Sequence, residues 1–252
     1  MNEKNHIKES RNSIIEFKNV HKSFDQNKVL KGINFIVYKG ENLVILGKSG
    51  SGKSVTIKCI VGLTKVNSGE ILVFETDITK LHYTELNKVR MKIGFLFQNG
   101  ALYDSMTVKQ NLEFTLKHHD KNLSEAEIEC SIKKALEDVG LLEVINKMPS
   151  ELSGGMKKRI GLARALIIEP EIILYDEPTS GLDTITSREI DELILEIQRK
   201  RKTTSIIITH DLACARITGN RIMIIKDGVI NAIGSYEELK NSSDKWVKSF
   251  FK

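Results

Sequence analysis

The chain has 252 residues, of which 40% are hydrophobic, 28% are charged and three are proline. This composition excludes a disordered or fibrous protein, and the length suffices for a sizeable core. The formal net charge of +5 is spread along the sequence, so it singles out neither a nucleic acid nor an anionic lipid surface. No apolar run approaches the roughly 18 residues that a membrane-spanning helix needs.

The first segment, residues 1–13, is polar and lacks the apolar centre of a secretory signal. We expect a disordered tail there, followed by a single domain over residues 14–252 of a cytoplasmic protein. The three cysteines are far apart and form no C-x-x-C pair. We expect all of them to be buried small hydrophobic residues, which suits a reducing compartment: Cys59, Cys130 and Cys214.

A first pair of strands is predicted at Ile14–Phe17 and Ile33–Val37 from branched and aromatic residues. Phe24 lies in the segment between them, shortly before a glycine-rich stretch. Its ring can stack on a purine, or it can be an ordinary core or turn aromatic, and the spacing alone favours neither.

The glycine-rich stretch has the pattern G-x-x-x-x-G-K-S, between an apolar strand at Leu43–Leu46 and a helix that ends at Gly62. Its glycines let successive N–H groups point at an anion, and the helix directs its positive dipole end to the same place. The lysine can bridge the outer phosphates, and the last serine can bind magnesium. This segment predicts a nucleoside triphosphate site at Gly47, Lys48, Ser49, Gly50, Ser51, Gly52, Lys53 and Ser54.

Downstream, a strand at Ile71–Phe74 and a short helix at Thr84–Arg90 lead to a buried strand at Ile93–Phe97. That strand ends at Gln98, whose amide can reach magnesium and the attacking water on a fold of this type. Taken alone, a glutamine here is more typical of a surface position.

The stretch from Asn99 to Met148 has a helical pattern, including a capping box at Ser124–Glu127 and a stop at Gly140. It holds too few apolar residues for a large core of its own. We therefore expect a helical subdomain that leans on the nucleotide-binding part.

Ser153, Gly154 and Gly155 open the next helix, whose N-terminus is a second possible anion site. One nucleotide does not need two such sites from the same chain. On these residues alone, an ordinary serine-capped helix is the simpler interpretation.

The apolar strand from Ile172 ends in two adjacent carboxylates, Asp176 and Glu177. In a doubly wound sheet, ligands bind at this end of the strands. Asp176 can hold magnesium through its water shell, and Glu177 can take a proton from water attacking the last phosphate. The basic run Arg199–Lys202 that ends the following helix is expected to be solvated and favourable to the helix dipole.

A further buried strand, Ser205–Thr209, ends at His210, which can sense the terminal phosphate, although a structural histidine is the simpler interpretation. A β-hairpin is then predicted through Asp227-Gly228, and Ser235 caps a last helix.

Together and in this order, these segments resemble the nucleotide-binding subunit of an ATP-binding cassette (ABC) transporter, over nearly the whole chain from Ile14. The signature Leu152–Met156 and the loop Ser180–Asp183 belong to the same pattern. The resemblance implies an α/β P-loop NTPase (ABC ATPase) fold with a RecA-like core, an antiparallel β-subdomain and a helical subdomain at about residues 99–160.

The resemblance also implies roles for the site residues, with ATP and Mg²⁺ as cofactors. Glu177 is the base, helped by Lys53, Gln98 and His210. Phe24 stacks on adenine, where tyrosine is more usual. The metal is held by Ser54, Gln98 and Asp176. In a head-to-tail homodimer, one copy closes over the nucleotide held by the other with Ser153, Gly154 and Gly155. Asp183 is also implied to bind the nucleotide.

A narrower resemblance, carried by Gln98–Val108 and Pro149–Met156, is to the ATPases of Mla-type phospholipid transporters. Met156 stands where the wider superfamily has glutamine, and it suits this subgroup. The resemblance implies a peripheral protein at the cytoplasmic face of the inner membrane. Its partners would be integral-membrane permease subunits and a periplasmic lipid-binding subunit, with no nucleic acid. The apolar loop Gly100–Tyr103 either docks a permease helix or packs internally.

Three functions therefore compete. The first is an ATPase that energises phospholipid movement between the inner membrane and the periplasm or outer membrane. The second is the same machine with another cargo, such as an amino acid or a metal chelate, because the cassette does not touch cargo. The third is a soluble ABC ATPase acting on nucleic acid or ribosomes. Such proteins usually have two cassettes or a long coiled-coil insertion, and the sequence has neither.

Overall fold

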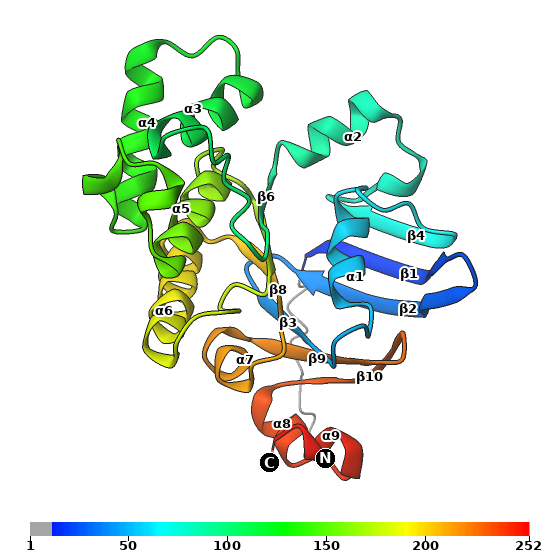
Figure 1. Cartoon of the computed structure of the whole chain (residues 1–252). Coiled ribbons are helices and arrows are strands. Elements are labelled where there is room, and N and C mark those ends of the chain that lie inside the picture. Colours follow the sequence, from blue (N-terminus) through cyan, green and yellow to red (C-terminus); the bar gives the residue numbers. More distant parts are fainter. Residues whose placement is uncertain (1–11, 252) are drawn as a thin grey trace, which may run out of the picture.

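The computed structural model describes residues 12–251, and its centre is a six-stranded sheet of order β10-β9-β3-β8-β7-β6 (Figure 1). All neighbouring pairs are parallel except β9 and β10, which form the hairpin predicted through Asp227-Gly228. Strands β3, β7 and β8 are fully buried because their residues are mostly branched aliphatics with helices or strands on both faces. The strands are β3 (Asn42–Leu46), β6 (Ile93–Leu96), β7 (Ile172–Asp176), β8 (Thr204–Thr209), β9 (Arg221–Lys226) and β10 (Val229–Gly234).

A second, antiparallel sheet has the order β2-β1-β4-β5, with bounds β1 (Ser13–Phe24), β2 (Asn27–Tyr38), β4 (Ser68–Val73) and β5 (Thr76–Asp77). Strands β1 and β2 are one long hairpin, whereas the sequence predicted two short strands. Most of the added residues are polar, and the longest apolar run among them is the pair Val29-Leu30, so they give no strand-length apolar run to detect. The tail predicted at residues 1–13 is too long, because Ser13 begins β1 and pairs with Tyr38 of β2. Residues 1–11 lie outside the described part of the chain.

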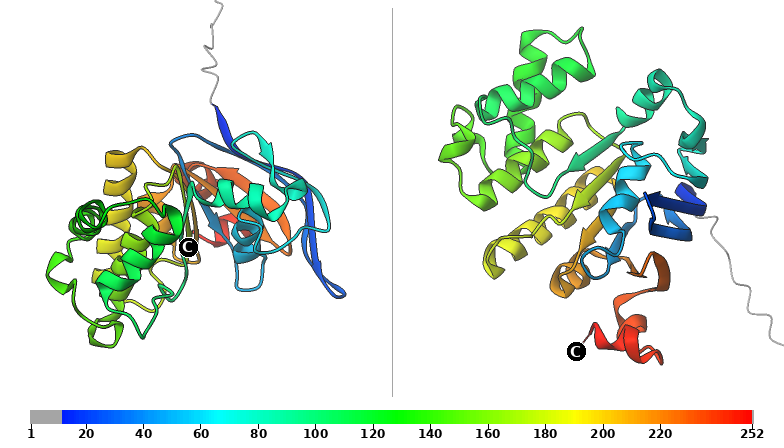
Figure 2. Two further views of the ribbon diagram at one scale, coloured as in Figure 1. Left: turned by 90° about the horizontal axis from the view of Figure 1, so that it is seen from above. Right: turned by 45° about the vertical axis from the view of Figure 1, so that its right-hand side comes forward.

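Helices pack on both faces of the six-stranded sheet, and α3, α4 and α5 form a lobe at one side of it (Figure 2). The capping box predicted at Ser124 begins α4, and Ser153 caps α5. The helices are α1 (Lys53–Ile60), α2 (Tyr83–Arg90), α3 (Val108–His119), α4 (Glu125–Asp138), α5 (Gly154–Leu166), α6 (Thr184–Arg201), α7 (Leu212–Thr218), α8 (Tyr236–Lys240) and α9 (Lys245–Ser249).

Two hydrophobic cores lie on opposite faces of the six-stranded sheet. Alternate residues of one strand enter different cores, as the two-residue period of a β-strand requires. Val44 of β3 belongs to the core shared with α3 to α7, whereas Leu43 and Ile45 belong to the core shared with α1 and the antiparallel sheet. Both faces are therefore covered, and functional side chains are left to the strand ends and loops.

Three local expectations were wrong. Cys130 is exposed on α4, whereas Cys59 and Cys214 are buried as expected. Arg201 is not solvated, because its guanidinium pairs with Asp138 and its side chain is only 14% exposed. The helix capped by Ser235 is followed by α9, so it is not the last. Within residues 12–251, no helix is both long enough and apolar enough to span a bilayer.

Candidate functional site

The loop between β3 and α1, Gly47–Ser54, is called the phosphate loop below. Two of its glycines are required by close backbone approaches. A Cβ at Gly47 would lie 2.5 Å from the carbonyl oxygen of Ile225 on β9, which no side chain tolerates. Gly52 has φ +104°, and a Cβ there would lie 2.8 Å from Leu30 Cδ2. Both ends of the loop are thus fixed against neighbouring strands.

The side chains of the phosphate loop fit a bound anion. Lys53 Nζ is buried and donates to the carbonyl oxygens of Gly47 (2.8 Å) and Lys48 (3.2 Å). Burial lowers the pKa of Lys53, while the carboxylates of Glu177 and Asp176 oppose that shift. Ser51 Oγ is buried and has no hydrogen-bond partner among the described residues. An unsatisfied hydroxyl and a buried ammonium in one glycine-rich loop form an environment in which a phosphate is favourable.

A possible metal site lies where α1 begins opposite the end of β7. Ser54 Oγ donates to Asp176 Oδ1 at 2.8 Å. Two potential oxygen ligands, one hydroxyl and one carboxylate, therefore lie next to each other. Residues 12–251 contain no cluster of three or more His, Cys, Asp or Glu side chains suited to a metal. Mg²⁺ commonly uses one or two protein oxygens and takes its remaining ligands from water and phosphate, so this pair fits it.

Glu177 lies directly beyond β7, and its side chain contacts two other predicted site residues. Its φ is +52°, and its N–H donates to the carbonyl oxygen of Ile208 on β8 at 2.9 Å, which fixes the turn. Glu177 Oε2 lies 2.7 Å from His210 Nδ1, and Glu177 Oε1 lies 3.9 Å from Lys53 Nζ. The structure thus brings together the phosphate loop, both carboxylates and His210.

Lys158 is a site residue that the sequence analysis missed. From α5, Lys158 Nζ donates to the backbone carbonyls of Glu177 (3.1 Å) and Gln98. It therefore ties the start of the Gln98 loop to the carboxylate turn. The Gln98 side chain points to Ser180, with Nε2 3.4 Å from Ser180 Oγ. Lys158 stands in an ordinary basic run, Lys157–Arg159, and no local signal marks it.

The predicted second anion site lies apart from the first. Ser153 Oγ accepts from Met156 N at 3.2 Å and caps α5. Asp183 caps α6, and hydrogen bonds from the Thr186 and Ile185 amides lower its pKa. Within residues 12–251, no hydrogen bond or ion pair joins Ser153, Gly154 or Gly155 to the phosphate loop. Within one chain, the phosphate loop and the capped end of α5 therefore make no polar contact with each other.

Phe24 lies at the end of β1, at the tip of the β1–β2 hairpin. Its side chain is 47% exposed, and Lys22 Nζ lies 4.6 Å from the ring centroid. Phe24 is thus not a core aromatic, which removes one of the sequence-based alternatives. A turn aromatic and a base-stacking ring both agree with this placement.

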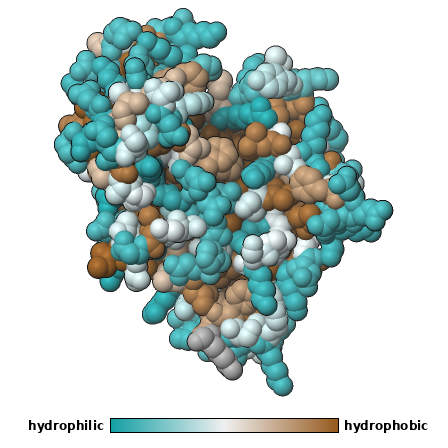
Figure 3. All heavy atoms as spheres, in the orientation of Figure 1, coloured by the Kyte–Doolittle hydropathy of each residue, from teal (hydrophilic) through white to brown (hydrophobic). Residues whose placement is uncertain are grey.

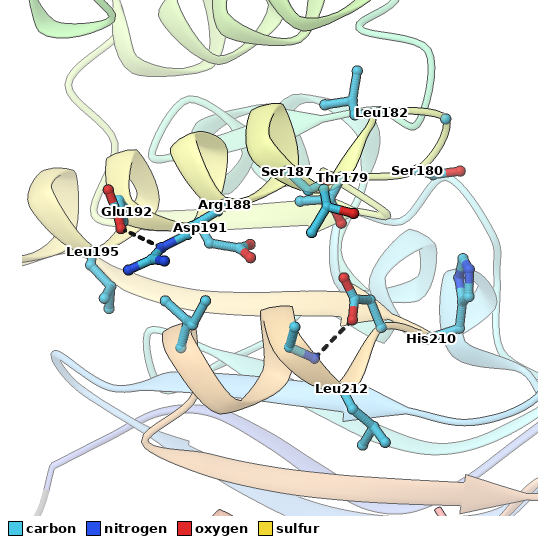
Figure 4. Close-up of a pocket in the computed structure, with 15 residues that line it drawn as sticks. Thr179, Ser180, Leu182, Ser187, Arg188, Asp191, Glu192, Leu195, His210 and Leu212 are labelled. Carbon is cyan, nitrogen blue, oxygen red and sulfur yellow. Dashed lines mark hydrogen bonds and ion pairs between the residues drawn. The ribbon is translucent and has the colours of Figure 1, made fainter.

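A groove of about 1040 Å³ runs between α6 and α7 beside the loop Thr179–Leu182 (Figure 4). Asp191 projects from α6 toward α7, is 1% exposed, and its Oδ1 has no hydrogen-bond partner among the described residues. Burial raises the pKa of Asp191 to about 6; a hydrogen bond with Cys214 opposes the shift, and the charges of Asp211 and Glu192 add to it.

A phosphate loop, an oxygen pair suited to magnesium and a carboxylate, all at the carboxyl ends of parallel strands of one sheet, define a P-loop nucleoside triphosphatase. The family model described as ABC transporter matches residues 30–180. The chain belongs to this family and is an ATP-binding cassette that hydrolyses ATP.

Relatives and a solved structure agree with this assignment. The chain is 39% identical over 237 residues to a probable ribonucleotide transport ATP-binding protein, mkl, of Mycobacterium leprae, covering 94% of the chain and 68% of that protein. It is 36% identical over 253 residues to the chloroplastic protein TRIGALACTOSYLDIACYLGLYCEROL 3 of Arabidopsis thaliana, covering 94% of the chain and 73% of that protein. The cassette MJ0796, solved as a dimer in a post-hydrolysis state with ADP and Pi, superposes with a TM-score of 0.82 at 34% identity, covering 88% of the chain and 98% of MJ0796.

Proposed function

We propose that this cassette works as a homodimer at the cytoplasmic face of the inner membrane and powers an Mla-type phospholipid transporter. The main observation in favour of a dimer is that the capped N-terminus of α5 makes no polar contact with the phosphate loop of its own chain. That helix end offers free N–H groups and a positive dipole, yet its own phosphate loop lies elsewhere. A second copy placed head to tail lets Ser153–Gly155 close over the partner's nucleotide.

Hydrolysis in this proposal uses Glu177 as the base. Its carboxylate accepts a proton from water while the water oxygen bonds to the γ-phosphorus, and the bond to the bridging oxygen breaks to release ADP. His210 fixes one carboxylate oxygen of Glu177, and Lys53 lies on the side of the other. Gln98, whose Nε2 lies 3.4 Å from Ser180 Oγ, adds a further polar side chain near the attacking water.

Magnesium would be held by Ser54 and Asp176, with Gln98 from the neighbouring strand end. When bound, it neutralises charge on the transferred phosphoryl group. Asp176 and Glu177 follow one another in the chain but have different partners, Ser54 and His210. This difference supports separate roles in metal binding and proton transfer.

Phospholipid as cargo is supported by the resemblance of Gln98–Val108 and Pro149–Met156 to Mla-type ATPases. The name of the Arabidopsis relative contains a glycerolipid, which agrees with it. The name of the mycobacterial relative specifies ribonucleotide transport instead, so another small cargo is the second candidate. Phospholipid exchange between labelled vesicles and the purified transporter, with and without ATP, separates the two. ATP-dependent exchange is the expected result.

A permease contact is proposed near the loop Gly100–Tyr103. Leu102 is half-buried against the core, whereas Tyr103 is 46% exposed and lies edge-on to Phe114 at 5.2 Å. Beside Phe114 is a groove of about 460 Å³ that Met106 also lines. On the face in Figure 3, hydrophobic side chains gather in the recess between the α3–α5 lobe and α2. Exposed aromatic residues beside a groove suit a docking helix.

The docking proposal is tested by Tyr103→Asp, with Tyr83→Asp as the matched control. Tyr83 is 73% exposed on α2, so both changes place a carboxylate on the surface. We expect Tyr103→Asp to lose co-purification with integral-membrane subunits and to keep ATP binding, while Tyr83→Asp keeps both. Unchanged co-purification of Tyr103→Asp would refute this contact.

A further inference from the structure

Helix α9 is far from the phosphate loop in sequence, yet both elements line one cavity. A cavity of about 290 Å³ separates the two elements. Its lining comes from the apex of the loop, the end of β9 and a single aromatic of α9: Lys48, Ser49, Gly50, Ser51, Ile225, Lys226, Asp227 and Trp246. An indole ring thus borders the segment whose amides face a triphosphate.

Several contacts fix the position of Trp246. Asp244 caps α9 and accepts from Trp246 N at 2.7 Å. The Trp246 ring lies edge-on to Phe250 at 4.8 Å, and Lys226 Nζ lies 4.4 Å from its centroid. Lys226 follows Ile225, whose carbonyl oxygen approaches Gly47 at the start of the phosphate loop. The ring is therefore held by its own helix and by the strand end that supports the loop.

The apex of the phosphate loop lacks such support. A Cβ at Gly47 or Gly52 would collide with a neighbouring strand, but a Cβ at Gly50 would meet nothing within 4 Å. A glycine-rich apex loses much conformational freedom when its amides are fixed on a phosphate. A rigid aromatic on the far side of a small cavity restricts the space into which that apex can move.

We propose that Trp246 is a positioning residue for ATP binding: its ring limits the outward movement of Lys48–Ser51 and so lowers the entropy lost when the phosphate is bound. Lys226 places the ring through its cation–π contact. The proposal rests on ATP binding by the cassette and is independent of the cargo and of the permease, so failure of the lipid assay leaves it intact.

The first test uses the wild-type full chain, because Trp246 is its only tryptophan. Acrylamide quenching of Trp246 emission is measured without nucleotide and with saturating ADP, after calorimetry has confirmed that ADP binds. We expect the quenching constant to fall roughly twofold as the loop becomes ordered. Lys53→Ala at the same ADP concentration should show little change. An unchanged quenching constant in ADP-saturated wild type overturns the proposal.

The second test compares Trp246→Ala with Phe251→Ala and Trp246→Phe. Phe251 packs edge-on against Tyr236 in the same C-terminal layer and does not line the cavity, so it controls for general loosening. Trp246→Ala should raise the KM for ATP roughly fivefold while kcat stays within about twofold. The KM of Trp246→Phe should be close to that of the wild type. An equal KM change in Phe251→Ala, or a fall in kcat alone in Trp246→Ala, contradicts the proposal. If Trp246→Ala does not fold, the wild-type quenching result decides.

Discussion

The phosphate loop and the capped end of α5 are the two anion sites in the function we propose, and they differ in what surrounds them. The phosphate loop is enclosed: Lys53, Ser54, Asp176, Glu177 and His210 are linked by hydrogen bonds or close ion pairs. The α5 end has only its own cap, and its glycines face α6 and Leu182. The first region contains the groups for chemistry, and the second contributes N–H groups and a dipole.

In the proposed dimer, this difference lets one chain bind ATP while full turnover depends on a partner. Groups that exchange protons or hold a metal have to be placed to within a fraction of an ångström, and contacts within one chain achieve this. A helix end that only adds positive potential can arrive from another molecule. The comparison predicts that changes in the two regions have different consequences.

The largest effect is expected from Glu177→Gln. Removing the base should lower kcat by roughly 10²- to 10⁴-fold, because the carboxylate no longer accepts the proton of water. ATP should still bind, and the closed dimer should persist, which gel filtration with ATP detects. Glu171→Gln is the matched control, since Glu171 pairs with Lys92 on the surface. If Glu177→Gln turns over ATP at close to the wild-type rate, Glu177 is not the base.

Lys53→Ala should act on binding. Loss of a charged hydrogen-bond donor to phosphate is expected to weaken ATP affinity roughly 10- to 100-fold. Lys58→Ala, on the same helix but away from the loop, should bind ATP as the wild type does. Calorimetric titration with ATP measures both. Wild-type affinity in Lys53→Ala would mean that its ammonium does not reach the phosphates.

The third prediction concerns stability, which does not alter turnover or ATP affinity directly, and it lies outside both regions. Because the folded-state pKa of Asp191 is about 6, above its ordinary value of 3.8, the unfolded chain ionises first as the pH rises. The free energy of unfolding should therefore fall between pH 4 and 6, by up to about 3 kcal/mol from this group, and then level off. Asp191→Asn should remove this slope and be more stable than wild type at pH 7. Urea denaturation at several pH values checks it, and a parallel slope in Asp191→Asn would assign the pH dependence to other groups.

The sequence predicted the phosphate-binding region better than its surroundings. Strands β3, β7 and β8 are recognisable because each is an unbroken apolar run, and their ends carry the functional side chains. The extension of β1 beyond Phe17 is mostly polar, and Val20 is its one fully buried residue, so no periodic signal exists. Lys158 could not be found because it acts across a tertiary contact to Gln98, and Trp246 because only the fold places it across a cavity from the phosphate loop. Side-chain partners that are distant in sequence require coordinates.

Complementation between two inactive variants tests the composite site most directly. Lys53→Ala keeps an intact α5 end, and Gly154→Asp keeps an intact phosphate loop. A Cβ at Gly154 meets only Leu182 Cδ2, at 3.5 Å, and a carboxylate suits a helix N-terminus, so Gly154→Asp should fold normally while repelling the partner's phosphate. Each variant alone should be nearly inactive.

An equimolar mixture should recover roughly a quarter of wild-type turnover, because half of randomly formed dimers are mixed and each contains one intact pair. The measurement is the steady-state ATPase rate of the mixture against the sum of its parts. Activity well above that sum is the predicted result. A mixture no more active than its parts, or Gly154→Asp alone as active as wild type, would contradict the shared site.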